Sequence, residues 1–255
     1  MNAHYPIVDG HAHLDQLEDL DRELTEAKNC GVTAIIGVGM SVKSNQKILA
    51  IAEGHPGYVF PAIGYHPWEV RKSEIEKNLA FIEQNINLSI AIGEVGLDYK
   101  VKVKRDYQKK AFSEILTLST RYHKPLILHC RGSHRRVLSM ISDSGITRAV
   151  FHWYTAPLDL LKEIVDAGYY ISATPALTHS PPHRHAVREA PVERILVETD
   201  CPVTHHGRSS RPSDVLITLR EVAKLKGLPV EDVAERTSQN AMTLFGLPSF
   251  AGKPS

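Results

Sequence analysis

The residues best suited to chemistry in this 255-residue sequence are histidines and acidic residues that follow short apolar runs. His11 and His13 stand two apart, so in an extended segment both side chains project from the same side. Two imidazoles placed in this way could bind one metal ion, although such a pair does not define a site by itself. Further residues of metal-ligating types end four later runs: Glu94, His129, His152 and Asp200.

Eight short runs rich in Val, Ile, Ala and aromatic residues would position these side chains. The runs are nearly continuous rather than alternating, which is typical of strands buried on both faces of a parallel sheet. Stretches with helical spacing lie between them, and several end at a glycine suited to a left-handed cap. The predicted strands are residues 7–9, 34–38, 59–64, 89–94, 125–129, 149–152, 169–173 and 195–200.

This alternation predicts an α/β protein with a (β/α)8 TIM barrel, as a single domain over residues 1–255 with an extra carboxy-terminal helix over residues 230–245. An open doubly wound sheet would show the same alternation. However, no GxGxxG segment follows the first run, and residues 37–39 are too short a match to a phosphate-binding fingerprint. The barrel is therefore the favoured architecture.

In a barrel, the carboxyl ends of all strands meet at one mouth, where active sites of this fold are built. Two carboxylates and four imidazoles would then meet there, and burying an unpaired carboxylate is costly. A pair of divalent metal ions would resolve this, whereas the alternative of satisfied polar residues has to explain why six potential ligands meet at one rim. Nitrogen and oxygen ligands without thiolate suit zinc, manganese, iron or cobalt, and magnesium is an alternative.

The overall composition excludes several classes of protein. With 42% hydrophobic and 23% charged residues, the chain is neither disordered nor fibrous, and a net charge of +1 disfavours a general DNA-coating protein. Three cysteines without a CxxC pair argue against a disulfide framework and a cysteine zinc knuckle. No secretion signal and no run of eighteen apolar residues is visible, so we expect a soluble, cytoplasmic protein without a membrane partner.

The sequence resembles the TatD family of metal-dependent hydrolases and deoxyribonucleases, in the amidohydrolase superfamily, over almost the whole chain. The resemblance implies a barrel that binds two metals, with Glu94 bridging them. His11, His13 and Asp200 would complete the first set of ligands, and His129 and His152 would complete the second. The segments that carry it are residues 9–14, 62–67, 92–99, 128–131, 150–152, 198–202 and 240–241.

The function that follows is a divalent-metal-dependent deoxyribonuclease, an exonuclease that cleaves phosphodiester bonds with a hydroxide held between the metals. Asp200 is expected to orient this water or accept its proton, while Glu94 bridges the ions. His66, at the end of the third run, is expected to contact the scissile phosphate or the leaving oxygen. Arg131 is expected to bind phosphate with both of its guanidinium arms. Single-stranded DNA or strand ends are the expected substrate, with no obligate protein partner.

Other side chains near the strand ends would shape this mouth. Basic residues that follow the fourth, fifth, seventh and eighth runs predict a positive rim, which suits a polyanion. Tyr99, Trp153 and Tyr154 could stack on a base. Six further histidines are expected to line or rim the mouth: His134, His179, His183, His185, His205 and His206.

Two other functions stay open at this point. Residues 153–157 and 201–207 depart from the better-known members of the family, and such loops shape the substrate pocket in this fold. A small-molecule hydrolase acting on an amide, lactone or phosphoester is therefore the alternative. A metal-binding protein without catalysis is disfavoured by the complete ligand set and the candidate base.

Overall fold

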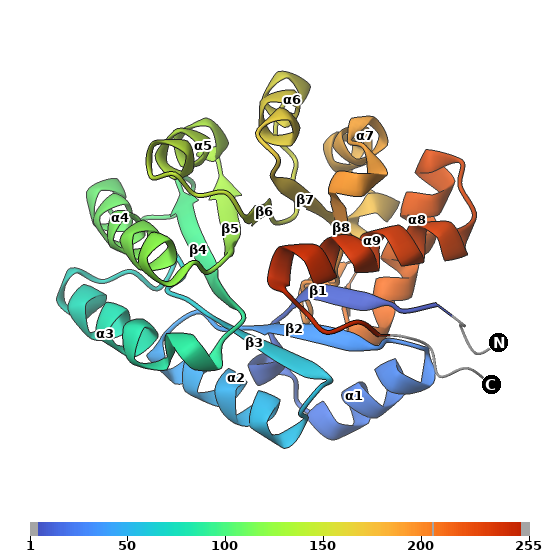
Figure 1. The fold of residues 1–255 in the computed structure, drawn as a ribbon, viewed down its shortest axis with the longest axis horizontal. Helices are drawn as coiled ribbons and strands as arrows, with labels where there is room; N and C mark the ends of the chain where they lie inside the picture. Colours follow the sequence, from blue (N-terminus) through green and yellow to red (C-terminus); the bar gives the residue numbers. More distant parts are fainter. Residues whose placement is uncertain (1–4, 206, 251–255) are drawn as a thin grey trace.

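The computed structural model describes residues 5–205 and 207–250. One sheet contains eight parallel strands in chain order: β1 (Val8–Ala12), β2 (Ala34–Val38), β3 (Val59–Ile63), β4 (Ala91–Asp98), β5 (Leu126–Arg131), β6 (Ala149–Phe151), β7 (Tyr170–Ala173) and β8 (Ile195–Val197). Figure 1 shows most helices arranged around these strands, whereas the last helix lies across them. The helices are α1 (Leu20–Asn29), α2 (Val42–Gly54), α3 (Ile75–Asn85), α4 (Arg105–Tyr122), α5 (His134–Asp143), α6 (Leu158–Asp166), α7 (Pro181–Glu189), α8 (Val215–Lys226) and α9 (Val230–Phe245).

The barrel closes where the chain beyond β8 meets β1. Ala12 forms a parallel bridge with Cys201, and the His13 amide donates to the Cys201 carbonyl over 2.8 Å. Asp9 reinforces the seam, because its carboxylate accepts from the Thr199 amide at 2.9 Å and from the Thr199 hydroxyl at 2.6 Å. The TIM barrel predicted from the strand and helix alternation is confirmed, and the open doubly wound sheet is wrong.

The predicted extra helix α9 covers the amino-terminal end of the barrel. Its Asn240 side chain donates to the Ile195 carbonyl at the start of β8, and Ser238 donates to the Pro6 carbonyl just before β1. Between these contacts, α9 packs on an inner apolar cluster of the strands that includes Val8, Ile36, Ala91, Ile127, Val150 and Leu196. None of the helices in the described ranges meets the length and hydropathy that a bilayer-crossing segment requires.

Two strands carry irregularities that the sequence analysis did not anticipate. The pairing shifts between Asp9 and Ala12 on β1, and again between Ile92 and Val95 on β4. In each case three steps along one strand match two on its neighbour, as in a β-bulge, which redirects a side chain.

The fourth strand also runs on to Asp98, four residues beyond its predicted end at Glu94. Within this longer strand, Gly96 lets β4 approach β5 closely. A Cβ on Gly96 would lie 2.2 Å from the His129 carbonyl oxygen.

Candidate metal centre

Four side-chain atoms meet at the carboxyl end of the barrel, one each from His11, His13, Glu94 and Asp200. The Nε2 atoms of the two histidines are 3.3 Å apart, each lies 3.4 Å from Glu94 Oε2, and each lies 3.5 Å from Asp200 Oδ1. A tetrahedral ion with bonds of about 2.0–2.1 Å separates its ligand atoms by about 3.3–3.4 Å. These five distances therefore match the spacing expected of ligands around one ion.

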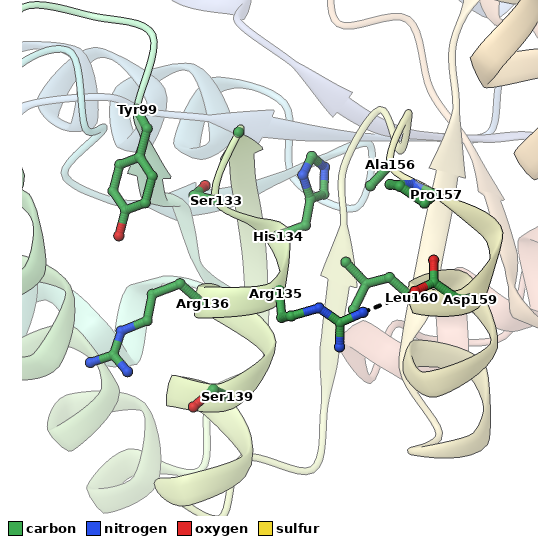
Figure 2. Close-up of a pocket in the computed structure, with 11 residues that line it drawn as sticks. Tyr99, Ser133, His134, Arg135, Arg136, Ser139, Ala156, Pro157, Asp159 and Leu160 are labelled. Atoms are coloured by element: carbon green, nitrogen blue, oxygen red, sulfur yellow. Dashed lines mark hydrogen bonds and ion pairs between the residues drawn. The ribbon is translucent and has the colours of Figure 1, made fainter.

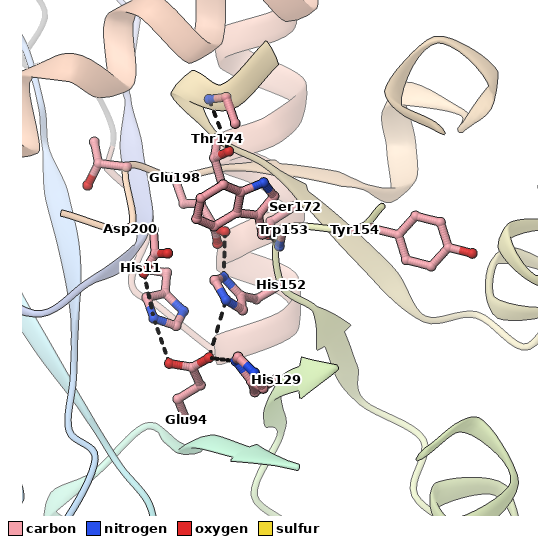
Figure 3. A network of polar contacts seen from close by, with 12 residues as sticks. His11, Glu94, His129, His152, Trp153, Tyr154, Ser172, Thr174, Glu198 and Asp200 are labelled. Atoms are coloured by element: carbon pink, nitrogen blue, oxygen red, sulfur yellow. Dashed lines mark hydrogen bonds and ion pairs between the residues drawn. The ribbon is translucent and has the colours of Figure 1, made fainter. Parts of the chain in front are cut away.

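A second group of nitrogens surrounds the other oxygen of the same glutamate. Glu94 Oε1 lies 2.7 Å from His129 Nδ1, 3.2 Å from His152 Nε2 and 3.3 Å from His66 Nε2. Figure 3 shows Glu94 between His11 on one side and His129 and His152 on the other. Each carboxylate oxygen thus faces a different group, which is the geometry that a bridging ligand needs.

The far nitrogens of three histidines are held by acceptors that fix the position of the ring proton. His13 Nδ1 donates to the Val38 carbonyl at 3.0 Å, and His152 Nδ1 donates to Glu198 Oε1 at 2.8 Å. His129 uses its Nε2 to donate to Asp98 Oδ2 at 3.2 Å. The nitrogen that faces the centre is then the unprotonated one in each neutral ring, as metal binding requires.

His66 has the opposite arrangement. Its Nδ1 accepts the backbone N–H of Trp68 at 3.2 Å, so the proton of the neutral ring is on Nε2, which points at Glu94. A protonated ring nitrogen cannot ligate a metal but can donate a hydrogen bond. Burial lowers the pKa of His66 to about 4, despite the nearby Glu94 carboxylate, so the ring is a neutral donor near pH 7.

The electrostatics of the centre favour a bound cation. Burial alone would raise the pKa of Glu94, but the surrounding imidazoles, among them His152 and His11, hold it well below its usual range. Burial opposes a charge on His13 as well, yet Glu94 and Asp200 raise the pKa of this histidine to about 9. Without metal the carboxylates therefore retain a proton on His13, and a divalent ion would take the place of that charge.

Backbone geometry fixes both carboxylates. Asp200 adopts a left-handed conformation with φ of 52°, which is uncommon outside glycine and is held by its amide donating to the His11 carbonyl at 2.9 Å. Gly64 packs directly on the backbone of Glu94, because an added Cβ would lie 2.5 Å from the Gly93 carbonyl carbon. The Asn45 side chain pins Gly64 by bonding both its amide and its carbonyl.

Sequence reasoning missed three residues of the centre: Asp98, Glu198 and Trp68. Asp98 and Glu198 orient His129 and His152, and the Trp68 indole donates to Asp98 Oδ2 at 2.6 Å. Both carboxylates lie inside segments that carried the family resemblance. The available signal was their acid type beside proposed ligands, since metal-bound histidines commonly donate to a carboxylate.

The residues predicted to contact the substrate differ in how close they lie to the centre and how exposed they are. Arg131 is exposed at the end of β5, and no contact in the described ranges connects its side chain with the centre. Tyr154 is wrong as a stacking residue because it is fully buried and its hydroxyl donates to the Pro157 carbonyl at 2.8 Å. Trp153 stays partly exposed, with its ring 5.6 Å from that of His205.

The additional histidines do not all line the mouth. His183 is wrong as a lining residue, because it is fully buried and joins the Tyr154 carbonyl to the Thr174 amide at 2.7 and 3.1 Å. His134 is also buried and packs against the Tyr154 ring. The rings of His179 and His205 lie 5.5 Å apart, His185 is exposed on α7, and His206 lies outside the described residues.

A (β/α)8 barrel with nitrogen and oxygen ligands gathered at its carboxyl end defines a class of metal-dependent hydrolases. Within that class, the chain belongs to the TatD related DNase family, whose model matches residues 8–246. The resemblance seen in the sequence is confirmed.

Individual relatives match over nearly the full chain. "Deoxyribonuclease TATDN3" from Homo sapiens is 30% identical, covering 94% of each protein, and "Putative deoxyribonuclease tatdn3" from Danio rerio is 31% identical, covering 93% of this chain and 96% of the relative. "Uncharacterized metal-dependent hydrolase YabD" from Bacillus subtilis is 30% identical, covering 94% of this chain and 98% of the relative. The crystal structure of the TatD homologue YJJV from Escherichia coli superposes with a TM-score of 0.89 at 25% identity, covering 97% of this chain and all of that one.

Proposed function

We propose that this protein is a deoxyribonuclease that uses two divalent metal ions to remove nucleotides from the ends of DNA strands. The observation that carries the proposal is the placement of Glu94, which presents one carboxylate oxygen to each of two groups of ligand atoms. His11, His13 and Asp200 would complete one site, and His129 and His152 would complete the other. Zinc, manganese and magnesium are the candidate ions, and the names of the family and its relatives support DNA as the substrate.

The residues of the chain have distinct roles in this reaction. Bound to these ligands, the two ions would lower the pKa of a water molecule and offset the charge that develops on the phosphate. Asp200 accepts the proton of the attacking water on a carboxylate oxygen, because the hydrogen bond from its amide to the His11 carbonyl holds this carboxylate close to the His11 ring. His66 donates its Nε2–H to an oxygen of the scissile phosphate. Asp98 and Glu198 keep the rings of His129 and His152 turned toward the centre.

The remaining expectations belong to the same proposal. Arg131, exposed where β5 ends, would bind a phosphate beyond the scissile one. We also propose that the chain acts as a single domain. We place its work in the cytoplasm, because Cys30, Cys130 and Cys201 are free thiols.

The test offers end-labelled single-stranded and duplex DNA to the purified protein with magnesium, manganese or zinc. We expect stepwise shortening from one end, abolished in His129→Ala and retained in the control His185→Ala, which removes an exposed histidine from α7. Metal analysis of the isolated protein identifies the ion. DNA that stays intact with every metal would overturn the proposal, and turnover of a lactone or simple ester would then favour a small-molecule hydrolase.

A further inference from the structure

A groove of about 870 Å³ opens beside the metal centre, between the loop that follows β3 and the loop that follows β4. Its lining contains four basic side chains, Arg71, Lys72, Lys102 and Lys104, and no acidic one. Trp68 forms the part of the lining that also contacts the centre, and Tyr107 lies in the lining as well. Its volume is within the range of pockets that bind small organic ligands.

The basic side chains of this groove form no ion pair in the described part of the chain. All four basic residues are exposed, and the ion pairs found within residues 5–205 and 207–250 involve other cations. The Arg71 guanidinium donates only to the backbone carbonyls of Trp68 and Val70. The groove therefore has a local excess of positive charge, although the whole chain carries only +1.

A second cavity, between α5 and α6, differs in this respect (Figure 2). It also contains arginines, but the Arg135 guanidinium is paired with Asp159 at 3.0 Å and with Glu163 at 2.9 Å. Asp159 itself lines that cavity. Of these two cavities, the groove beside Trp68 is the one whose charge suits a polyanion.

Trp68 connects this groove with the reacting centre. Its indole N–H is bound to Asp98, and its ring centroid lies 4.8 Å from that of His66 and 5.7 Å from that of His129. Despite these contacts, 43% of the residue is exposed, which is unusual for so large an aromatic side chain. An indole held by its edge, with surface left in solvent, offers a platform on which a nucleic-acid base can stack.

Both walls of the groove are held in place by hydrogen bonds. The Tyr65 hydroxyl accepts from the Arg71 amide at 2.8 Å and donates to the Glu69 carbonyl at 3.1 Å. The Gln108 side chain bonds the Asp98 amide and donates to the Val103 carbonyl at 3.1 Å. The basic side chains therefore project from an ordered backbone, which lowers the entropic cost of binding.

We propose that this groove binds the nucleotides next to the scissile phosphate of a single DNA strand. Trp68 stacks on the base nearest the centre, and Arg71, Lys72, Lys102 and Lys104 contact the backbone phosphates. The proposal rests on the proposed nuclease function and adds the path of the strand. It also predicts a preference for single strands over duplex, because a base within a duplex has no free face for the indole.

The first test measures binding of a short phosphorothioate oligothymidine to the metal-loaded protein by fluorescence anisotropy at several salt concentrations. On a single strand, each phosphate contact contributes about −0.7 to the slope of log K against log salt. Lys102→Ala/Lys104→Ala should therefore reduce the magnitude of the slope by about 1.4 and weaken binding about tenfold. The control Arg220→Ala/Lys224→Ala removes the same charge from exposed positions on α8 and should keep the wild-type slope. An equal slope in the two double variants would overturn the proposal.

The second test uses the fact that the chain has only two tryptophans. In a Trp153→Phe background, Trp68 is the one remaining indole, and stacking of a base should quench its fluorescence when the oligothymidine binds. Binding without quenching would contradict the role of Trp68. If the nuclease function itself is wrong, the wild-type protein leaves every DNA intact. If only the groove proposal is wrong, the wild type cleaves DNA and Lys102→Ala/Lys104→Ala cleaves it with an unchanged KM.

Discussion

The two ends of the barrel are built from the same strands but contain opposite kinds of side chain. At the amino end, Val8 of β1 packs with Ala241, Leu244 and Phe245 of α9 in a hydrophobic cluster. At the carboxyl end, His11 of the same strand lies among imidazoles and carboxylates that are also buried. One end therefore supplies packing energy, and the other holds polar groups that cost energy to bury. The packing at the amino end therefore stabilises the fold enough to keep these polar groups buried at the carboxyl end.

The largest effect is expected from Glu94→Gln, because this residue belongs to both groups of ligand atoms. We expect loss of bound metal and a fall in nuclease activity well beyond the about 10–100-fold typical of residues that only orient ligands. Metal analysis and rate measurements check this, with the exposed Glu114→Gln on α4 as the control. A chelator should lower the Tm of the wild type but not of the variant. Retained metal at wild-type level would contradict the assignment of Glu94.

Phe245→Ala tests the opposite end of the barrel. The ring is buried in the inner cluster, so its loss should reduce the free energy of unfolding by about 3–5 kcal/mol, measured by urea denaturation. The control Leu88→Ala removes an exposed side chain and should change stability by less than about 0.5 kcal/mol. Metal content and the activity of the folded Phe245→Ala protein should stay at wild-type values. A loss of metal affinity would show that the two ends are not separable.

Asp98→Asn and Glu198→Gln sharpen the comparison within the mouth. Each removes the carboxylate that orients one histidine ring and leaves the shape of the side chain unchanged. We expect metal affinity to fall by about 10–100-fold in each variant, as found when outer partners of metal-bound histidines are lost. Competition with a chromogenic chelator measures this affinity. If the affinity does not change, the two carboxylates serve only to satisfy buried ring nitrogens.

The last prediction concerns the pH dependence of stability, which changes by a small amount per pH unit and should be confined to the carboxyl half of the barrel. Burial lowers the pKa of His183 to about 4, against an ordinary value of 6.5. Below pH 6.5 the unfolded chain takes up a proton that the folded chain does not, so this contribution to stability is lost as the pH falls from 6.5 to 4. In chelator, His183→Gln should make the free energy of unfolding less dependent on pH in this window, by about 1.4 kcal/mol per pH unit. Phe245→Ala should not alter the slope, and a changed slope there would count against the comparison.

The side chains that meet at the centre were predictable from the sequence because they lie at the ends of strands, and in a barrel the carboxyl ends of all strands meet at one mouth. Their orienting partners were not, since the roles of Asp98 and Glu198 depend on which ring nitrogen faces the centre. The extent of β4 was also not predicted, because the role of Gly96 depends on its close approach to His129 on the neighbouring strand.

The two loop predictions that are wrong, for His183 and Tyr154, failed for a different physical reason. A position after a strand indicates that a residue is near the mouth, but it does not show whether the side chain turns outward or packs beneath the next helix. His183 and Tyr154 pack in this second way: both are buried, and the His183 ring donates to the Tyr154 carbonyl. Burial of this kind depends on contacts between segments far apart in the sequence, which single-sequence patterns do not report.

The position of α9 has a consequence for how the protein is made. The helix follows all eight strands in the chain, yet it covers the amino-terminal end that the first strand begins to form (Figure 1). While the chain is being translated, the inner apolar cluster stays open until α9 has left the ribosome exit tunnel. Ile36, Ile127 and Leu196 can therefore be covered by α9 only after all eight strands have been synthesised, so we expect the last step of folding to wait for this helix.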